Sequence, residues 1–180
     1  MKNYKEIDGW FDFENVYDFL IEKLPATGKF VEIGAWLGKS SSYLCDNAIG
    51  KDIHIVDTWK GSDNELETHH KLATQTDIYE IFLENMGNRP FTPYQMTSVD
   101  AAKKFDDESV DVIFIDGNHT YEFVNEDIQA WLPKLKKGGY IAGDDYRPES
   151  PPLFGVIQAV KENFGEDFTL MGPCWIHQKG

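Results

Sequence analysis

Carboxylates and one histidine follow two predicted strands in the second half of the chain. Asp116 ends an apolar run that begins at Val110, and His119 comes three residues later. Asp144 and Asp145 follow the next predicted strand. Like charges repel at short range unless a cation lies between them, and oxygen-rich clusters favour hard ions such as Mg²⁺ or Mn²⁺. The pattern therefore predicts that the three aspartates bind a divalent metal ion.

Each of these residues also has a simpler interpretation. The pair Asp144 and Asp145 alone is typical of a solvated loop, and His119 alone is typical of a hydrogen-bonded loop histidine. A further carboxylate at a neighbouring strand end, Asp116, favours the metal site over the solvated loop. A histidine beside such a site can accept a proton at neutral pH, so we predict that His119 is a general base.

A glycine-containing loop follows the first predicted strand. It is Glu32-Ile33-Gly34-Ala35-Trp36-Leu37-Gly38, and a serine run that includes Ser41 comes next. Glycines allow a tight turn and a close backbone approach to a ligand, and the following helix N-terminus offers N–H groups to an anion. The segment matches neither a P-loop nor GxGxxG. Asp57 follows the second strand, about 20 residues further on, where nucleotide-binding folds place a ribose-binding carboxylate.

Strands and helices alternate along the chain, which is typical of an α/β protein. The apolar periodicity predicts strands at residues 29–33, 52–57, 91–97, 110–116, 140–143, 168–171 and 175–178. It predicts helices at residues 13–24, 39–48, 78–86, 121–135 and 153–164. We expect one domain over residues 1–180, with a helical segment at 1–27 and a doubly wound, mostly parallel sheet with a C-terminal antiparallel hairpin in 28–180. Ligands of such sheets bind beyond the carboxyl ends of the strands, where the polar residues above lie.

Composition narrows the range of functions. The formal net charge of −14 over 180 residues argues against a nucleic-acid substrate, because phosphate backbones are repelled. No signal-peptide pattern and no apolar run of about 20 residues is present, so we expect a cytoplasmic protein without a membrane partner. Cys45 and Cys174 form no CxxC motif, and we interpret them as buried or free thiols.

The residues resemble class I S-adenosylmethionine-dependent methyltransferases. More narrowly, they resemble the macrocin-type and cephalosporin hydroxylase-like family of metal-dependent O-methyltransferases. The matching segments are Phe30-Val31-Glu32-Ile33-Gly34, Val56-Asp57-Thr58-Trp59-Lys60-Gly61, Phe114-Ile115-Asp116-Gly117-Asn118-His119-Thr120-Tyr121, Asp127, Trp131-Leu132-Pro133-Lys134-Leu135, Gly138-Gly139 and Asp144-Asp145. The resemblance implies a seven-stranded Rossmann-like sheet, S-adenosylmethionine as cofactor, and Mg²⁺ or another divalent cation.

The resemblance also implies a role for each site residue. The residues that would bind the cofactor are Glu32, Gly34, Ala35, Trp36, Ser41, Asp57, Thr58, Trp59, Ser98, Val99 and Asp116. Asp116, Asp144 and Asp145 match the metal-ligand positions. His119 matches the general base of the family, and the resemblance implies that Asp116 is the second catalytic residue.

The resemblance leaves the methyl acceptor open. Family members with known sugar substrates carry extra N-terminal domains or long lids, whereas only a short helical segment precedes the first predicted strand here. We expect a small molecule or sugar, bound by the N-terminal helix, residues 60–87, residues 146–153 or a second subunit of a homo-oligomer. A metal-independent methyltransferase and a non-catalytic S-adenosylmethionine-binding protein are the alternatives. The absence of GxGxxG disfavours a dehydrogenase.

Overall fold

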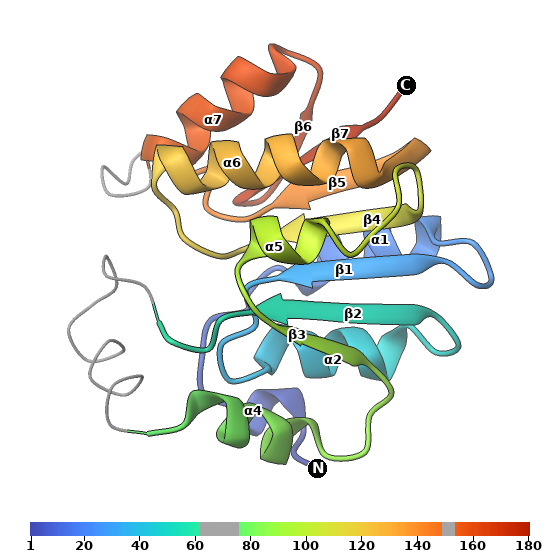
Figure 1. Cartoon of the computed structure of the whole chain (residues 1–180), viewed down its shortest axis with the longest axis vertical. Coiled ribbons are helices and arrows are strands. Elements are labelled where there is room, and N and C mark those ends of the chain that lie inside the picture. Colours follow the sequence, from blue (N-terminus) through green and yellow to red (C-terminus); the bar gives the residue numbers. More distant parts are fainter. Residues whose placement is uncertain (62–75, 149–153) are drawn as a thin grey trace.

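A computed structural model describes residues 1–61, 76–148 and 154–180 (Figure 1). Within these ranges the chain forms a seven-stranded sheet in the order β3-β2-β1-β4-β5-β7-β6. The strands are β1 (Lys29–Ile33), β2 (Asp52–Asp57), β3 (Thr92–Gln95), β4 (Val110–Ile115), β5 (Leu135–Gly143), β6 (Thr169–Met171) and β7 (Cys174–Gln178). β1 to β5 pair in parallel, whereas β7 runs antiparallel to β5 and β6. The predicted sheet with its antiparallel C-terminal hairpin is confirmed.

Helices cover both faces of the sheet (Figure 1). The helical elements are the 3₁₀ turns η1 (Tyr4–Glu6) and η2 (Leu132–Lys134) and the helices α1 (Glu14–Lys23), α2 (Lys39–Asn47), α4 (Ile78–Met86), α5 (Ser98–Ala102), α6 (Tyr121–Trp131) and α7 (Phe154–Phe164). Successive strand side chains point to opposite faces, so Phe30 packs in the apolar cluster of α1, α2 and α4, and Val31 in that of α5, α6 and α7. Among the described residues, no helix combines the length and apolarity needed to span a bilayer.

The region between α6 and β5 differs from the prediction. The helix predicted over residues 121–135 ends at Trp131, and the 3₁₀ turn Leu132–Lys134 follows. Pro133 explains this end, because proline has no N–H group for the helical ladder. β5 then begins at Leu135 rather than at residue 140. The predicted turn at Gly138-Gly139 is instead an irregularity inside β5, where the register against β4 shifts.

The segment before β1 lies across one face of the sheet and reaches its carboxyl edge. On α1, the ring of Tyr17 packs 5.7 Å from the ring of Phe30 and 4.8 Å from that of Phe114, measured between centroids. Nearer the N-terminus, the carbonyl oxygen of Gly9 accepts a hydrogen bond from Lys39 Nζ at 2.9 Å. Because Lys39 begins α2, directly after the glycine loop, this contact brings the N-terminal segment to the loops that follow the strands.

Candidate active site

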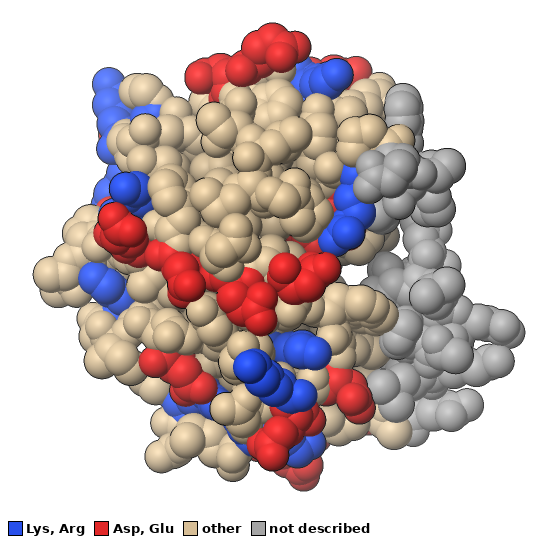
Figure 2. Space-filling view, turned by 180° about the vertical axis from the view of Figure 1, so that it is seen from behind, with Lys and Arg blue, Asp and Glu red and all other residues tan. Residues whose placement is uncertain are grey.

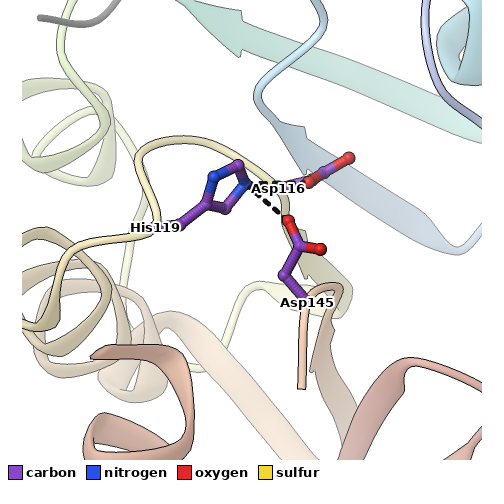
Figure 3. Close-up of side chains that lie close together, drawn as sticks. All are labelled: Asp116, His119 and Asp145. Atoms are coloured by element: carbon purple, nitrogen blue, oxygen red, sulfur yellow. Dashed lines mark ion pairs between the residues drawn. The ribbon is translucent and has the colours of Figure 1, made fainter. Parts of the chain in front are cut away.

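Three of the predicted site residues meet at the carboxyl ends of β4 and β5. These strands are parallel neighbours, so Asp116 and Asp145, which follow them, lie side by side. His119 Nε2 lies 2.9 Å from Asp145 Oδ2 and 3.6 Å from Asp116 Oδ1, as the dashed lines in Figure 3 show. One oxygen or nitrogen from each of the three side chains lies within 4.8 Å of the others. We name these three residues the acidic centre.

The loop after β5 holds Asp145 in a particular orientation. Asp145 has a left-handed backbone conformation with φ of 63°. Its Oδ1 accepts a hydrogen bond from Arg147 Nε at 3.0 Å, which leaves Oδ2 facing His119. Burial raises the pKa of Asp145, but the hydrogen bonds and charges of His119 and Arg147 lower it by a larger amount. The pKa of Asp145 therefore lies below its ordinary value. Asp145 therefore favours its charged form at the acidic centre, and its predicted role as a metal ligand stays a prediction.

Asp144 lies beside the acidic centre but is not one of its three grouped side chains. It is buried, and its Oδ1 accepts a hydrogen bond from Cys174 Sγ at 3.4 Å. Burial, followed by the charges of Asp116 and Asp145, raises the pKa of Asp144 to about 7. Its predicted role as a metal ligand stays a prediction.

The acidic centre has the features of a site for a divalent cation. His119 Nε2 is buried without a hydrogen-bond partner among the described residues, although two carboxylates lie close to it. Carboxylate oxygens such as those of Asp116 and Asp145 are the ligands that Mg²⁺ and Mn²⁺ accept, and His119 Nε2 would lie beside such an ion without having to bind it. Burial lowers the pKa of His119, but the two carboxylates outweigh it and raise the pKa to about 10. A bound cation would offset these carboxylates and so favour the neutral imidazole that a general base requires.

The glycine loop after β1 touches the acidic centre directly. Gly34 has φ of 88°, and a Cβ atom built on it would lie 1.9 Å from the carbonyl oxygen of Asp116. Only glycine allows this close approach of two backbones. The candidate cofactor loop and the acidic centre are therefore neighbours in space as well as on the same sheet edge.

Asp57 organises the glycine loop. Its Oδ2 accepts hydrogen bonds from the backbone N–H groups of Ala35 and Trp36 at 2.8 and 2.9 Å. Its Oδ1 accepts one from the N–H of Trp59 at 2.7 Å, and the indole N–H of Trp59 donates to the carbonyl of Trp36. Since a carboxylate has roughly four acceptor positions, one remains for a ligand. The structure thus gives Asp57 a role in loop geometry, and its predicted contact with the ribose stays a prediction.

Glu32 is fully buried beneath the glycine loop. Tyr17 Oη donates a hydrogen bond to Glu32 Oε1 at 2.7 Å, and Ser41 Oγ donates to Oε2. Burial raises the pKa of Glu32 to about 7, although the hydrogen bonds from the hydroxyl groups oppose this shift. The predicted pair Glu32 and Ser41 therefore meet each other, and their contact with a cofactor stays a prediction.

The pH dependence of stability should report this buried carboxyl. Its pKa is about 7 in the folded chain against an ordinary value of 4.5, so the folded state binds the proton more tightly. The free energy of unfolding therefore falls as pH rises through this window. Between pH 5 and pH 8, the free energy of unfolding of the wild type should fall by about 2–3 kcal/mol more than that of Glu32→Gln. Urea unfolding of both proteins at pH 5 and pH 8 measures these free energies. If the wild type and the variant differed by the same amount at both pH values, the raised pKa of Glu32 would be contradicted.

The remaining predicted cofactor residues lie on the same edge of the sheet. Thr97 caps α5, and Ser98 Oγ accepts a hydrogen bond from Trp131 Nε1 at 2.8 Å. Thr58 Oγ1 accepts a bond from the N–H of Lys60, and Val99 is half-buried. Whether these residues contact adenosine stays a prediction.

Sequence reasoning missed three side chains that support the site. Tyr17 contacts Glu32, Arg147 contacts Asp145, and Cys174 contacts Asp144. Tyr17 and Cys174 come from elements far along the chain from their partners, so no local pattern indicated them. Arg147 had a usable signal, because it is a cation two residues after an Asp-Asp pair.

Comparisons with known proteins agree with this geometry. A family model described as a methyltransferase domain matches residues 31–146. An uncharacterized protein of Sinorhizobium fredii is 26% identical over 145 residues, which cover 76% of this chain and 14% of that protein. The chain therefore spans a small part of this relative.

Two solved structures show the same fold at low sequence identity. The O-methyltransferase NovP has a TM-score of 0.65 and 18% identity, covering 92% of this chain and 78% of its own. CalS11, a TDP-rhamnose 3'-O-methyltransferase of calicheamicin biosynthesis, has a TM-score of 0.61 and 14% identity, covering 92% and 76%.

Proposed function

The chain belongs to the methyltransferase-domain family, and we propose that it transfers a methyl group from S-adenosylmethionine to a hydroxyl group of a small molecule or sugar with the help of a divalent cation. The observation that carries this proposal is the contact between Gly34 and the carbonyl of Asp116. It joins the candidate cofactor loop to the acidic centre, and a methyl donor and a metal-held hydroxyl must lie together for transfer.

The residues of the acidic centre suit deprotonation of a hydroxyl group. A bound cation would supply Lewis-acid stabilisation of the acceptor oxygen. Asp116 and Asp145 provide the negative charge and the oxygen atoms that hold such a cation. His119 presents Nε2 to the same space, and that atom takes the hydroxyl proton once the imidazole is neutral. The close approach at Gly34 keeps the cofactor loop fixed against these groups.

Turnover with and without metal tests the proposal. The chain is incubated with S-adenosylmethionine and a panel of catechols and nucleotide sugars, and release of S-adenosylhomocysteine is measured. We expect at least one hydroxylated acceptor to give release that depends on Mg²⁺ or Mn²⁺ and that EDTA abolishes. Turnover that EDTA leaves unchanged would contradict the metal role.

Removal of Asp57 should weaken cofactor binding. In Asp57→Ala the N–H groups of Ala35, Trp36 and Trp59 lose their shared acceptor, so the glycine loop loses its fixed geometry. We expect the Kd for S-adenosylmethionine to rise about 100-fold, because hydrogen bonds to charged groups contribute about 1.5–3 kcal/mol each. Calorimetry measures the Kd. Asp52→Ala, at the opposite end of β2, is the matched control and should bind as the wild type does; equal affinities of the two variants would reject this role of Asp57.

A metal-independent methyltransferase is the second candidate, and Arg147 favours it. Its Nε donates to Asp145 Oδ1 at 3.0 Å, and its guanidinium nitrogen lies 3.8 Å from Asp144 Oδ2. Arg147 and a protonated His119 together offset part of the negative charge without a metal ion. In that case turnover persists in EDTA and is lost in Arg147→Ala.

The acceptor is proposed to be a small molecule rather than a nucleic acid. The net charge is −14, and acidic side chains gather in a band across the face shown in Figure 2. At the carboxyl edge, Asp12 Oδ1 lies 3.9 Å from a guanidinium nitrogen of Arg147. The N-terminal segment is therefore one candidate wall of the acceptor site. The other predicted walls, residues 60–87 and 146–153, lie partly outside the described residues. The sugar substrate named for CalS11 makes a sugar hydroxyl a reasonable first choice.

A homo-oligomer and a cytoplasmic location complete the proposal as expectations. Cys45 and Cys174 are both free and buried, which suits a reducing compartment. Size-exclusion chromatography with light scattering would measure the oligomeric state.

A further inference from the structure

Cys174 contacts the loop that carries the predicted metal ligands. It is the first residue of β7 and is fully buried, and its Sγ donates to Asp144 Oδ1 at 3.4 Å. Asp144 is 8% exposed, so its oxygens depend on protein donors more than on water. The thiol is therefore one of the donors that orient the carboxylate of Asp144, together with the backbone N–H of Asp145.

The preceding residue holds the same loop from the other side of Asp145. The carbonyl oxygen of Pro173 accepts a hydrogen bond from the N–H of Tyr146 at 2.8 Å. Pro173 in the β6–β7 turn and Cys174 at the start of β7 thus bind the two neighbours of Asp145. Asp145 has a left-handed φ of 63°, which is uncommon for a residue other than glycine, although aspartate adopts it more readily than most. The contacts of Pro173 and Cys174 with its two neighbours hold the loop in this conformation.

We propose that Cys174 is a positioning residue of the metal centre, whose thiol orients Asp144 and, with Pro173, fixes the loop that presents Asp145. The proposal rests on the metal site of the proposed function. A side chain that orients a ligand group commonly affects metal affinity by about 10–100-fold when it is removed. A thiol is a weak donor, so the lower end of this range applies here.

Titration with Mn²⁺ followed by electron paramagnetic resonance tests the proposal without a methyl acceptor. We expect the Mn²⁺ Kd of Cys174→Ala to rise about 10-fold, and that of Cys174→Ser to stay near the wild-type value because a hydroxyl also donates. Cys45→Ala is the matched control. It removes the other buried thiol, whose Sγ faces the carbonyl of Pro90 at 3.8 Å, and should bind Mn²⁺ as the wild type does.

A double-mutant cycle shows whether the thiol acts through Asp144. In the Asp144→Ala background, which removes the acceptor of the thiol, replacement of Cys174 by alanine should add less than about a two-fold further loss of Mn²⁺ affinity. Calorimetry with S-adenosylmethionine should give an unchanged Kd for Cys174→Ala, which separates positioning from general damage to the fold.

Three results would overturn the proposal, and they differ from one another. Wild-type protein that binds no Mn²⁺ removes the metal site, and with it the metal part of the proposed function. Wild-type binding with equal affinity in Cys174→Ala leaves the proposed function intact and rejects the role of the thiol. An undiminished effect of Cys174→Ala in the Asp144→Ala background shows that the thiol does not act through Asp144.

Discussion

Asp145→Ala is expected to weaken Mn²⁺ binding by about 100-fold or more, since even side chains that only orient a ligand are worth about 10–100-fold. Asp145 Oδ2 is the carboxylate oxygen nearest His119 Nε2, at 2.9 Å. The substitution removes a charged donor from a centre that has three grouped side chains. It also removes the hydrogen bond that Arg147 Nε donates at 3.0 Å, so less of the positive charge of Arg147 is offset beside the site.

The measurement is a Mn²⁺ titration by electron paramagnetic resonance at constant ionic strength. Asp107→Ala is the matched control, because Asp107 is an exposed aspartate that pairs with Lys134 on a different loop. Each variant loses one negative charge, so a nonspecific electrostatic effect would lower both affinities equally. That equal loss is the result that would contradict a metal site at the acidic centre.

Gly34→Ala is expected to lower the free energy of unfolding by about 4 kcal/mol, as the sum of overlap and backbone strain. The added Cβ would lie 1.9 Å from the carbonyl oxygen of Asp116, and the φ of 88° is unfavourable for alanine. Neither backbone can move without disturbing the pairing of β1 with β4. We therefore expect weak cofactor binding and weak metal binding in the same variant.

Gly50→Ala separates the two causes of this loss. Gly50 also has a positive φ, 77°, but a Cβ atom there would meet nothing within 4 Å. Its substitution should cost only about 1 kcal/mol, the cost of the backbone conformation. Urea unfolding of both variants measures the difference. Equal losses would mean that the close approach at Gly34 contributes nothing to stability.

The sequence predicted the sheet well because the strands carry strong apolar patterns. β2 and α4 match their predicted bounds, and so does β1. Boundaries failed where a local feature overrode periodicity, as at Pro133 and in the irregular start of β5. Gly138 and Gly139 are turn-forming residues, but pairing of β5 with β4 kept them inside a strand.

The site was predicted in position more accurately than in detail. Asp116, His119 and Asp145 meet as expected, because residues after adjacent parallel strands share an edge. Asp57 accepts hydrogen bonds from three backbone N–H groups, which spacing did not predict, and its expected contact with a ribose stays a prediction. Such contacts depend on side-chain rotamers and loop conformations, which spacing along the chain does not specify.

The partners of Glu32 and Asp144 were also beyond a reading of local patterns. Tyr17 lies 15 residues before Glu32, and Cys174 lies 30 residues after Asp144. The first contact forms because α1 packs on one face of the sheet, and the second forms because β7 pairs with β5. Buried polar pairs of this kind follow from the fold, not from a motif.

The most direct test of the account is a crystal structure with S-adenosylmethionine and Mn²⁺ bound, with anomalous scattering used to locate the metal. We expect one anomalous peak beside the carboxylates of Asp116 and Asp145, with His119 next to it, the cofactor against the Gly34 loop and its sulfonium methyl group directed toward the metal. A structure with the cofactor in that loop but no peak, in which Arg147 still pairs with Asp145, would contradict metal-assisted transfer.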